Sequence, residues 1–294
     1  VKDGKLYSVI PSNGTGDCTV VRNTTSTKFN SSMILVSAAA NVPRLNYLTV
    51  GGNPFLLDET QSTNLITYSQ DFTNVAWEKL QAALDVNFAA SPDGTSNATR
   101  YRTTNINSEN QVRRHISAGV FNDVYFTSIF VKKTITRYLR IRVLFVTNGA
   151  TPGSGDVFFD LDNNTVALQG SGLISRIVPI KDGWLRCDVR ATYGNAGLAN
   201  FVDIGFSNIL NSTPTLASEG LIYGAQLEIG ANLSSYIPTA GAAVTRNADV
   251  ITVAPPAGTV KITTTFSNDT TQVLTTIPTT FTVPDGLIKQ VLMQ

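Results

Sequence analysis

Apolar and polar side chains alternate along several segments of this chain, and this alternation limits the fold more than any other feature. Side chains of a β-strand point to its two faces in turn, so a period of two predicts a strand with one buried face. The clearest example runs from Arg137 to Phe145. One face would hold Arg137, Leu139, Ile141, Val143 and Phe145, and the other Tyr138, Arg140 and Arg142.

Similar segments recur at the spacing of an antiparallel sheet, with Gly, Asn, Asp and Pro between them. They are 157–161, 165–168, 184–193, 201–206 and 221–228. Helical composition is limited to Val75–Val86, where helix and extended strand are equally good interpretations. We therefore expect an all-β chain, an antiparallel Greek-key or jelly-roll β-sandwich with an irregular N-terminal region and a small C-terminal β tail.

Three regions follow from the pattern. Residues 1–63 would form a connecting region of short strands, 64–249 the sandwich, and 250–294 a small β tail. The tail is too small to build a good core alone. We expect it to pack on the main domain or on a neighbouring subunit.

Charge and residue usage exclude several classes of protein. Charged residues make up 15% of the chain and the net charge is +1, so no overall field attracts nucleic acid. His115 is the single histidine, and no phosphate-binding or nucleophile motif is present. The apolar stretch Met33–Val42 is too short to span a bilayer. We expect no cofactor and no membrane insertion.

Two cysteines, Cys18 and Cys187, lie far apart in the sequence, and their spacing does not show whether they pair. We favour free thiols, because a chain of this length can fold on its core without a disulfide. Residue 1 is Val rather than Met, which indicates a chain that was cut, processed or numbered from within a longer protein.

Several segments together resemble a modular unit of tailed-bacteriophage fibre and spike proteins. The most specific is YGAQLEIGANLSSYIPTAGAAVTRNAD, at 223–249. The others are YSVIPSNGTGDCTVVRNTTST (7–27), NVPRLNY (41–47), FLLDETQSTNLITYSQDFTNVAW (55–77), SPDGTSNAT (91–99), FVKKTITRYLRI (130–141) and DGWLRCDV (182–189).

The resemblance implies a lectin-like or carbohydrate-binding-module-like β-sandwich in a head fibre, tail fibre or spike, commonly trimeric and exposed on the virion. It supplies no catalytic residues. Two positions depart from the pattern: 53–55 stands where a Cys-Pro turn is usual, and Asp58 stands where Glu is usual.

Polar side chains on the outward faces of the expected strands form a candidate glycan-binding surface. They are Tyr138, Arg140, Arg142, Trp184, Arg186, Asp188, Arg190, Asp203, Gln226 and Glu228. Aromatic rings can stack on the apolar face of a sugar, while arginines, carboxylates and amides bond its hydroxyls. The alternative is a solvated sheet face held by cross-strand ion pairs, which antiparallel sheets ordinarily have. Trp184 could also cap the core at the start of a strand.

Two weaker candidates for binding remain. Asp160 and Asp162 could offer oxygen ligands to Ca²⁺, although an Asp/Asn hairpin turn explains them as well. A basic cluster could contact anionic polysaccharide, or be a solvated loop or strand end. It consists of Arg113, Arg114 and His115, with Lys132 and Lys133 downstream.

A glycoside hydrolase would need two carboxylates, one of them with a raised pKa. The best set in the sequence is Asp188, Asp203 and Glu228. Neighbouring arginines should lower the pKa of these groups rather than raise it. We therefore expect a protein that is not an enzyme.

We interpret the chain as a virion-surface subunit that binds host-cell glycans, other virion proteins and copies of itself, as a homotrimer. A structural connector or capsid-decoration protein is the alternative, and a polysaccharide depolymerase is a third interpretation. Self-association is expected because the C-terminal strands would lack a core of their own.

Overall fold

The fold of this chain is known from a computed structural model that describes residues 18–116, 120, 122–145, 155–193 and 200–294. Within these residues the regular elements are all β-strands, which confirms the predicted class. None of them forms a helix long and apolar enough to cross a membrane. The chain divides into two compact units. The larger unit holds residues 63–233 and 237–244, and the smaller holds those up to 62 with 234–236 and 245–294.

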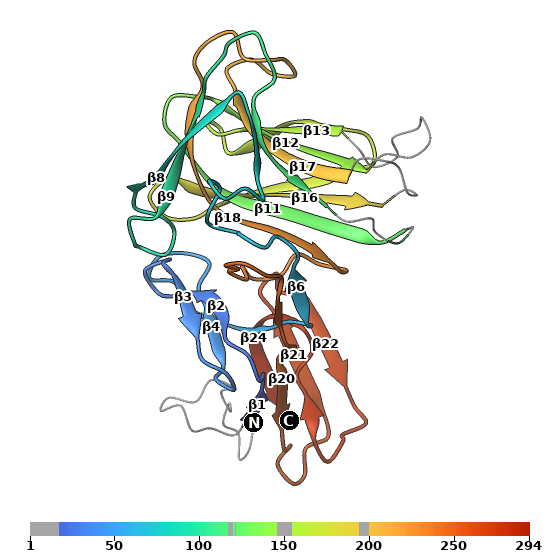
Figure 1. The fold of residues 1–294 in the computed structure, drawn as a ribbon. Coiled ribbons are helices and arrows are strands. Elements are labelled where there is room, and N and C mark those ends of the chain that lie inside the picture. Colours follow the sequence, from blue (N-terminus) through green and yellow to red (C-terminus); the bar gives the residue numbers. More distant parts are fainter. Residues whose placement is uncertain (1–17, 117–119, 121, 146–154, 194–199) are drawn as a thin grey trace. The chain divides into compact units, whose positions relative to one another are not determined.

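The larger unit contains two six-stranded antiparallel sheets, which form the two layers seen in Figure 1. The first sheet has the order β14-β13-β12-β17-β10-β7. Its strands are β7 (Glu78–Leu80), β10 (Gln111–His115), β12 (Tyr138–Phe145), β13 (Gly155–Asp160), β14 (Thr165–Gln169) and β17 (Asn200–Ser207).

The second sheet has the order β15-β16-β11-β18-β9-β8. Its strands are β8 (Ala82–Ala89), β9 (Ala98–Thr103), β11 (Val124–Lys133), β15 (Ile174–Pro179), β16 (Trp184–Thr192) and β18 (Glu219–Ile229). The inner strands of this sheet have the order β16-β11-β18-β9, and those of the first sheet have the order β13-β12-β17-β10. Along the chain these eight strands pass repeatedly from one sheet to the other, as in two Greek keys. The sandwich is therefore a jelly roll.

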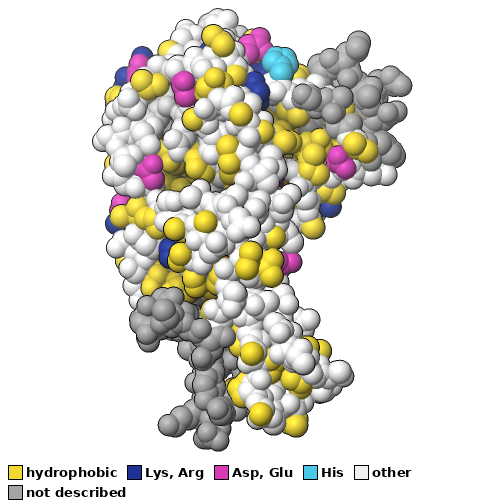
Figure 2. Space-filling model, turned by 60° about the horizontal axis from the view of Figure 1, so that its bottom comes forward, with side chains coloured by type: hydrophobic (Ala, Val, Ile, Leu, Met, Phe, Trp, Pro, Cys, Tyr) yellow, Lys and Arg dark blue, Asp and Glu magenta, His cyan; other side chains and the backbone are white. Residues whose placement is uncertain are grey.

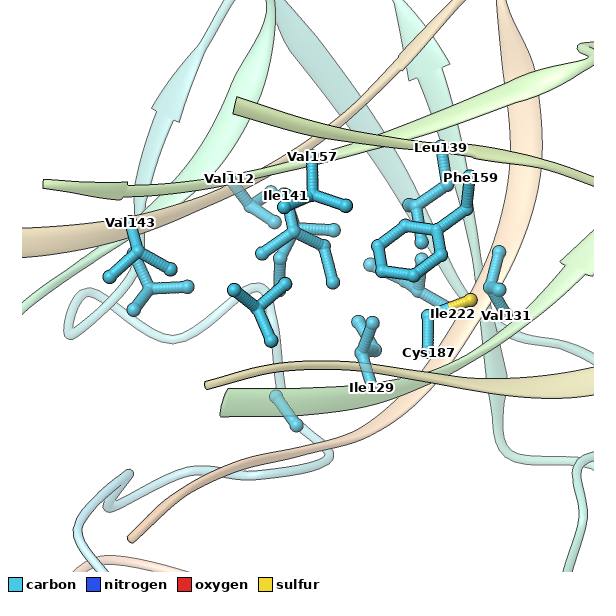
Figure 3. Packing of buried hydrophobic residues seen from close by; sticks show 14 of the residues in the cluster. Val112, Ile129, Val131, Leu139, Ile141, Val143, Val157, Phe159, Cys187 and Ile222 are labelled. Carbon is cyan, nitrogen blue, oxygen red and sulfur yellow. The ribbon is translucent and has the colours of Figure 1, made fainter. Parts of the chain in front are cut away.

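The core of the sandwich lies between the two sheets and is built by the predicted alternation. Leu139 and Ile141 of β12 and Val189 of β16 are at most 1% exposed. Figure 3 shows β12 and β13 side chains packed against those of β11 and β16, with Cys187 among them. Burial raises the pKa of the Cys187 thiol. No disulfide joins Cys187 to Cys18.

The segment 75–86, whose conformation the sequence left open, is not helical: residues 75–77 form a turn, and the chain is largely extended from Glu78 on. It contributes to β7 and β8, and Gln81 between them has a φ of +49°. Backbone pairing of β7 with β10 and of β8 with β9 outweighs the modest helix propensity of these residues.

The smaller unit combines strands from both ends of the described chain. Its sheets have the orders β1-β20-β23, β22-β21-β24-β5-β4 and β2-β3. The strands are β1 (Cys18–Val21), β2 (Ser26–Phe29), β3 (Leu35–Ala38), β4 (Arg44–Asn46), β5 (Phe55–Asp58), β20 (Val250–Val253), β21 (Ile262–Phe266), β22 (Thr271–Leu274), β23 (Phe281–Thr282) and β24 (Gly286–Met293). The short strands β6 (Ser62–Asn64) and β19 (Val244–Arg246) pair with each other.

This unit changes the expected organisation of the chain. The N-terminal region and the C-terminal tail, expected as separate parts, share one core, because β1 pairs with β20 and β5 with β24. Leu56, Ile251 and Ile288 are among its buried residues. The tail strands therefore have a core within the chain, and the lack of one is no longer a reason to expect self-association. Residues 7–17 of the segment that resembles phage fibre proteins lie outside the described residues.

Candidate functional site

The ten side chains predicted to bind a glycan lie on two different sheets and do not form one surface. Those on the outer face of the first sheet are Tyr138, Arg140, Arg142 and Asp203. Those on the outer face of the second sheet are Trp184, Arg186, Asp188, Arg190, Gln226 and Glu228. Alternation identifies the outward side of each strand but not the sheet that the strand joins, so the prediction of a single surface was wrong.

The outer face of the second sheet is covered by the chain itself. Trp184 is 3% exposed, and its Nε1 donates a hydrogen bond to the carbonyl oxygen of Ala90 at 3.2 Å. Gln226 and Glu228 are fully buried, and Gln226 Oε1 accepts a bond from the Ile237 amide at 2.7 Å. Trp184 therefore cannot stack on a sugar. A buried position at the start of a strand was the other interpretation of this residue.

The rest of that face is used in local contacts. Asp188 is 5% exposed, and its Oδ2 accepts a bond from Arg176 Nε at 3.0 Å. Arg186 donates to Ser128 Oγ at 3.0 Å. Arg190 is half-buried.

The outer face of the first sheet carries a row of alternating charges that crosses five strands. We call this set the charge ladder. In order across the sheet, its members are Asp156 (β13), Arg142 (β12), Asp203 (β17), Arg113 (β10) and Glu78 (β7), each directly opposite the next in the strand register. Opposite charges at facing positions stabilise a sheet by roughly 0.2–1 kcal/mol per pair.

Two bidentate pairs hold the ladder. Arg142 donates from Nε to Asp156 Oδ1 at 2.8 Å and from Nη2 to Oδ2 at 3.0 Å. Arg113 donates from Nε to Asp203 Oδ1 at 2.7 Å and from Nη2 to Oδ2 at 2.9 Å. Bidentate bonds fix both planar groups in one orientation. Asp203 is fully buried, whereas Arg142 and Asp156 remain 23% and 21% exposed.

A loop brings a further carboxylate onto the ladder. Glu109 Oε1 lies 2.9 Å from Arg142 Nη1 and 3.6 Å from Arg140 Nη1, and Arg140 also donates to Gln111. The loop passes so close to β17 that a Cβ at Gly205 would lie 2.3 Å from the carbonyl oxygen of the residue after Glu109. Glycine at 205 therefore lets the loop reach this position.

Aromatic and imidazole groups border the ladder. The Arg113 guanidinium lies 3.7 Å from the centroid of the Phe201 ring, a cation–π contact. His115 Nε2 is 3.1 Å from Glu78 Oε2. His115 is 61% exposed, and it is the cyan side chain at the surface in Figure 2. Figure 2 also shows how sparse charged side chains are on that face of the molecule.

The ladder region is close to electrically neutral. With Arg140 and Glu109 included, it holds three guanidinium groups and four carboxylates. Burial raises the pKa of Asp203, against the lowering effect of Arg113. The hydrogen bonds that Arg142 donates to Asp156 in turn raise the pKa of Arg142. The region can therefore offer fixed donors and acceptors to hydroxyl groups without attracting strongly charged ligands.

The predicted basic cluster does not form one patch. Arg114 points to the opposite side of β10 from Arg113 and donates to the carbonyl oxygen of Ala76 at 2.8 Å. Lys133 is paired with Asp162. Adjacent residues of a strand face opposite ways, which separates a run of three basic residues.

The candidate calcium ligands serve a hairpin turn instead. Asp160 Oδ1 accepts the amide of Asp162 at 3.0 Å, and Asp160 Oδ2 accepts Arg137 Nη2 at 2.7 Å. These bonds lower the pKa of Asp160 to about 2. Among the described residues, no group of three or more His, Cys, Asp or Glu side chains is arranged to hold a metal ion.

The carboxylates considered for hydrolysis are also separated, with Asp203 on the first sheet and Asp188 and Glu228 on the second. The expectation that arginines would lower their pKa was wrong for Asp188 and Asp203. Burial raises the pKa of both groups more than Arg176 and Arg113, respectively, lower it.

The smaller unit contains a buried ion cluster that the sequence analysis missed. Arg22, Arg44 and Arg246 have side chains at most 1% exposed. Asp249 accepts hydrogen bonds from Arg22 Nη1 at 2.6 Å and from Arg44. Glu59 Oε2 lies 2.8 Å from Arg44 Nη2 and 3.4 Å from Arg246 Nη2. All five residues lie in segments that resemble phage fibre and spike proteins, and this resemblance is the sequence signal that could have pointed to the cluster.

Comparisons with known proteins give low similarity. No model of a protein family matches the chain, and no curated protein is similar to it in sequence. Among solved structures, it resembles the enzymatically active domain of tailspike protein 4 of bacteriophage CBA120, with 11% identity, a TM-score of 0.36 and coverage of 57% of this chain and 21% of that one.

Two further structures are similar to a comparable degree. The CBM22-1–GH10 modules of Clostridium thermocellum xylanase 10B give 15% identity, a TM-score of 0.33 and coverage of 61% of this chain and 30% of that one. A putative sugar-binding protein of Bacteroides thetaiotaomicron gives 13% identity and a TM-score of 0.32, and the match covers 58% of this chain and 95% of that one. The chain thus spans less than a third of the first two proteins. All three TM-scores are below 0.5 and assign neither family nor function.

Proposed function

We propose that this chain is a non-enzymatic subunit of a virion fibre or spike, and that its sandwich binds neutral glycans of the host surface through the charge ladder. The observation that carries the proposal is the ladder itself. Five charged side chains in register, four of them at least partly exposed, give one sheet a rigid polar face in a chain with only 15% charged residues.

Rigidity of the side chains matters because ordering flexible side chains costs free energy, which a weak contact does not supply. Immobilising a flexible side chain costs roughly 0.5–1.5 kcal/mol on binding. In the ladder, Arg113 and Arg142 are already held by bidentate pairs. Glu78 and Glu109 are 45% and 46% exposed, so they can accept bonds from sugar hydroxyls. The near neutrality of the region favours a neutral glycan over an acidic one.

A single contact of this kind is weak, and adhesion would come from several copies on one particle. Linking sites raises the overall affinity by a factor of roughly 10²–10⁴ without any new contact. We therefore include assembly into a homotrimer, attached to other virion proteins and displayed at the virion surface, in the proposal.

A structural connector is the second candidate, and one observation favours it. The ladder's strongest donors already bond to carboxylates within the sheet, as they would on a face that only stabilises the fold. A connector would attach tightly to virions and show no affinity for cells.

Binding of ladder variants to host cells and to an array of neutral glycans tests the proposal. Arg142→Ala and Glu109→Ala should each weaken binding about tenfold while the melting temperature stays within a few degrees. Lys289→Ala, which removes an exposed ion pair with Asp269 in the smaller unit, is the control and should bind normally. Unchanged binding by both ladder variants would exclude this face. Trp184→Ala is unsuitable because Trp184 is buried.

A further inference from the structure

Strand β8, at the edge of the second sheet, contains a bulge that turns side chains outward. Its first half pairs with β9 in register, with Asp85 opposite Arg100, but the next pair is Ala89 with Ala98. Three residues of β8 therefore face a single residue of β9, and Asn87 within the bulge has a φ of +54°. Bulges at sheet edges re-aim side chains and are often found at functional sites.

The bulge exposes two large apolar side chains, Val86 and Phe88, each 48% exposed. Among the aromatic side chains that the structure describes, Phe88 alone is exposed. Exposing these groups forgoes the stabilisation that burial would give. A contact with a ligand would recover it.

Polar groups surround Phe88 in fixed positions. The Arg100 guanidinium lies 4.0 Å from the centroid of the Phe88 ring and covers one of its faces, so the exposed part belongs to the rest of the ring. Arg100 Nε donates to Asp85 Oδ2 at 2.7 Å, and Arg102 Nη2 donates to Asp85 Oδ1 at 3.1 Å. Arg102 and Asp85 remain 42% and 35% exposed.

The charges of this group balance. Glu219 Oε2 lies 3.9 Å from Arg100 Nη1, so two guanidinium groups face two carboxylates. The site therefore combines an apolar ring with donors and acceptors and no net charge. A pyranose has the same combination, with an apolar C–H face and a rim of hydroxyls.

We propose that Phe88, Asp85 and Arg102 form a second carbohydrate-binding site, separate from the charge ladder, which takes a neutral pyranose. The sugar stacks on the open part of the Phe88 ring. Its hydroxyls bond to Asp85 and Arg102, while Arg100 positions the ring. This site goes beyond the proposed function, because it lies on the other sheet and uses none of the ladder's residues.

A tryptophan at the site reports directly on stacking. In the Phe88→Trp variant of the whole chain, saturating neutral oligosaccharides of glucose, galactose or mannose should shift the emission to shorter wavelength and protect it from acrylamide. The two native tryptophans are at most 3% exposed and should respond little. Val75→Trp, at a residue 97% exposed and not part of the site, is the control and should not respond.

Loss of the ring gives the second measurement. In the Arg142→Ala background, which weakens binding by the ladder, Phe88→Ala should weaken binding of the oligosaccharide that shifts the Phe88→Trp emission by roughly fivefold to tenfold, and Arg142→Ala should leave the emission shift intact. A Phe88→Trp emission that no neutral oligosaccharide changes, or unaltered affinity in Phe88→Ala, would overturn this site. Neither result bears on the ladder, whose own variants report on it separately.

Discussion

Replacing Asp249 with asparagine should destabilise the smaller unit more than any surface substitution in it. The Asp249 side chain is 1% exposed and is shared by Arg22 and Arg44, while Arg246 lies 3.7 Å away. Asparagine keeps the shape of the side chain but removes its charge. The change therefore isolates the electrostatic part of the cluster.

The structure sets the size of the effect. Three buried guanidinium groups are opposed by two carboxylates, Asp249 and Glu59. In the variant a single carboxylate remains, and Arg22 loses the carboxylate that its Nη1 contacts at 2.6 Å. Removing one partner of a buried ion pair costs about 3–5 kcal/mol, because the remaining charge has no water to replace it. Salt should change this loss little, since buried pairs are weakly screened.

Hydrogen exchange followed by mass spectrometry can locate the loss. Peptides from β1, β5 and β20 should exchange roughly 10²–4 × 10³ times faster in Asp249→Asn, since each 1.4 kcal/mol is a factor of ten. The fluorescence of Trp77 and Trp184 reports on unfolding of the larger unit alone, because both tryptophans of the chain lie in that unit.

The matched control is Asp269→Asn. Asp269 is 72% exposed and pairs with Lys289 at the surface of the same unit, so its loss should cost less than about 1 kcal/mol. If Asp249→Asn accelerates exchange no more than this control, the buried cluster does not stabilise the unit and our reasoning is wrong.

Three further predictions concern packing, pH and reactivity. Gly220→Ala should cost about 1–3 kcal/mol in urea unfolding, because its Cβ would lie 2.3 Å from the Phe206 ring, whereas Gly230→Ala, with nothing nearer than 3.8 Å, should cost far less. Burial and two neighbouring carboxylates raise the pKa of Asp58 to about 8. Between about pH 4 and pH 8 the folded state therefore holds a proton that the unfolded state has lost, and the smaller unit should lose stability as pH rises through this range. Asp58→Asn should abolish that loss. Cys187 is fully buried, so thiol reagents should label it only at the rate of unfolding, and rapid labelling of the native protein would contradict the core packing.

Much of the sandwich could be predicted from the pattern of residues. The alternation at 137–145 and 184–193 placed Leu139, Ile141 and Val189 in the core, and all three are buried. Burial on one side of a strand is a local property with a period of two, so it is visible in any window of the sequence.

The candidate sites could not be predicted in the same way. Trp184 looked like an outward platform, but the segment at Ala90 covers it. The ladder depends on register across five strands, and Glu109 reaches it from a loop. Such contacts join residues distant in the sequence, and no local period encodes them.

The sequence alone determined that this chain is all-β and which side of each strand faces the core, because these follow from side-chain chemistry and a two-residue repeat. The tertiary structure alone decided which strands are neighbours, and thereby which charges meet. It put β12 between β13 and β17, lining up Arg142 with Asp156 and Asp203, and it paired β1 with β20 to give both ends of the described chain one core. Strand pairing depends on the joint burial of all the apolar faces, a property of the whole fold rather than of any segment.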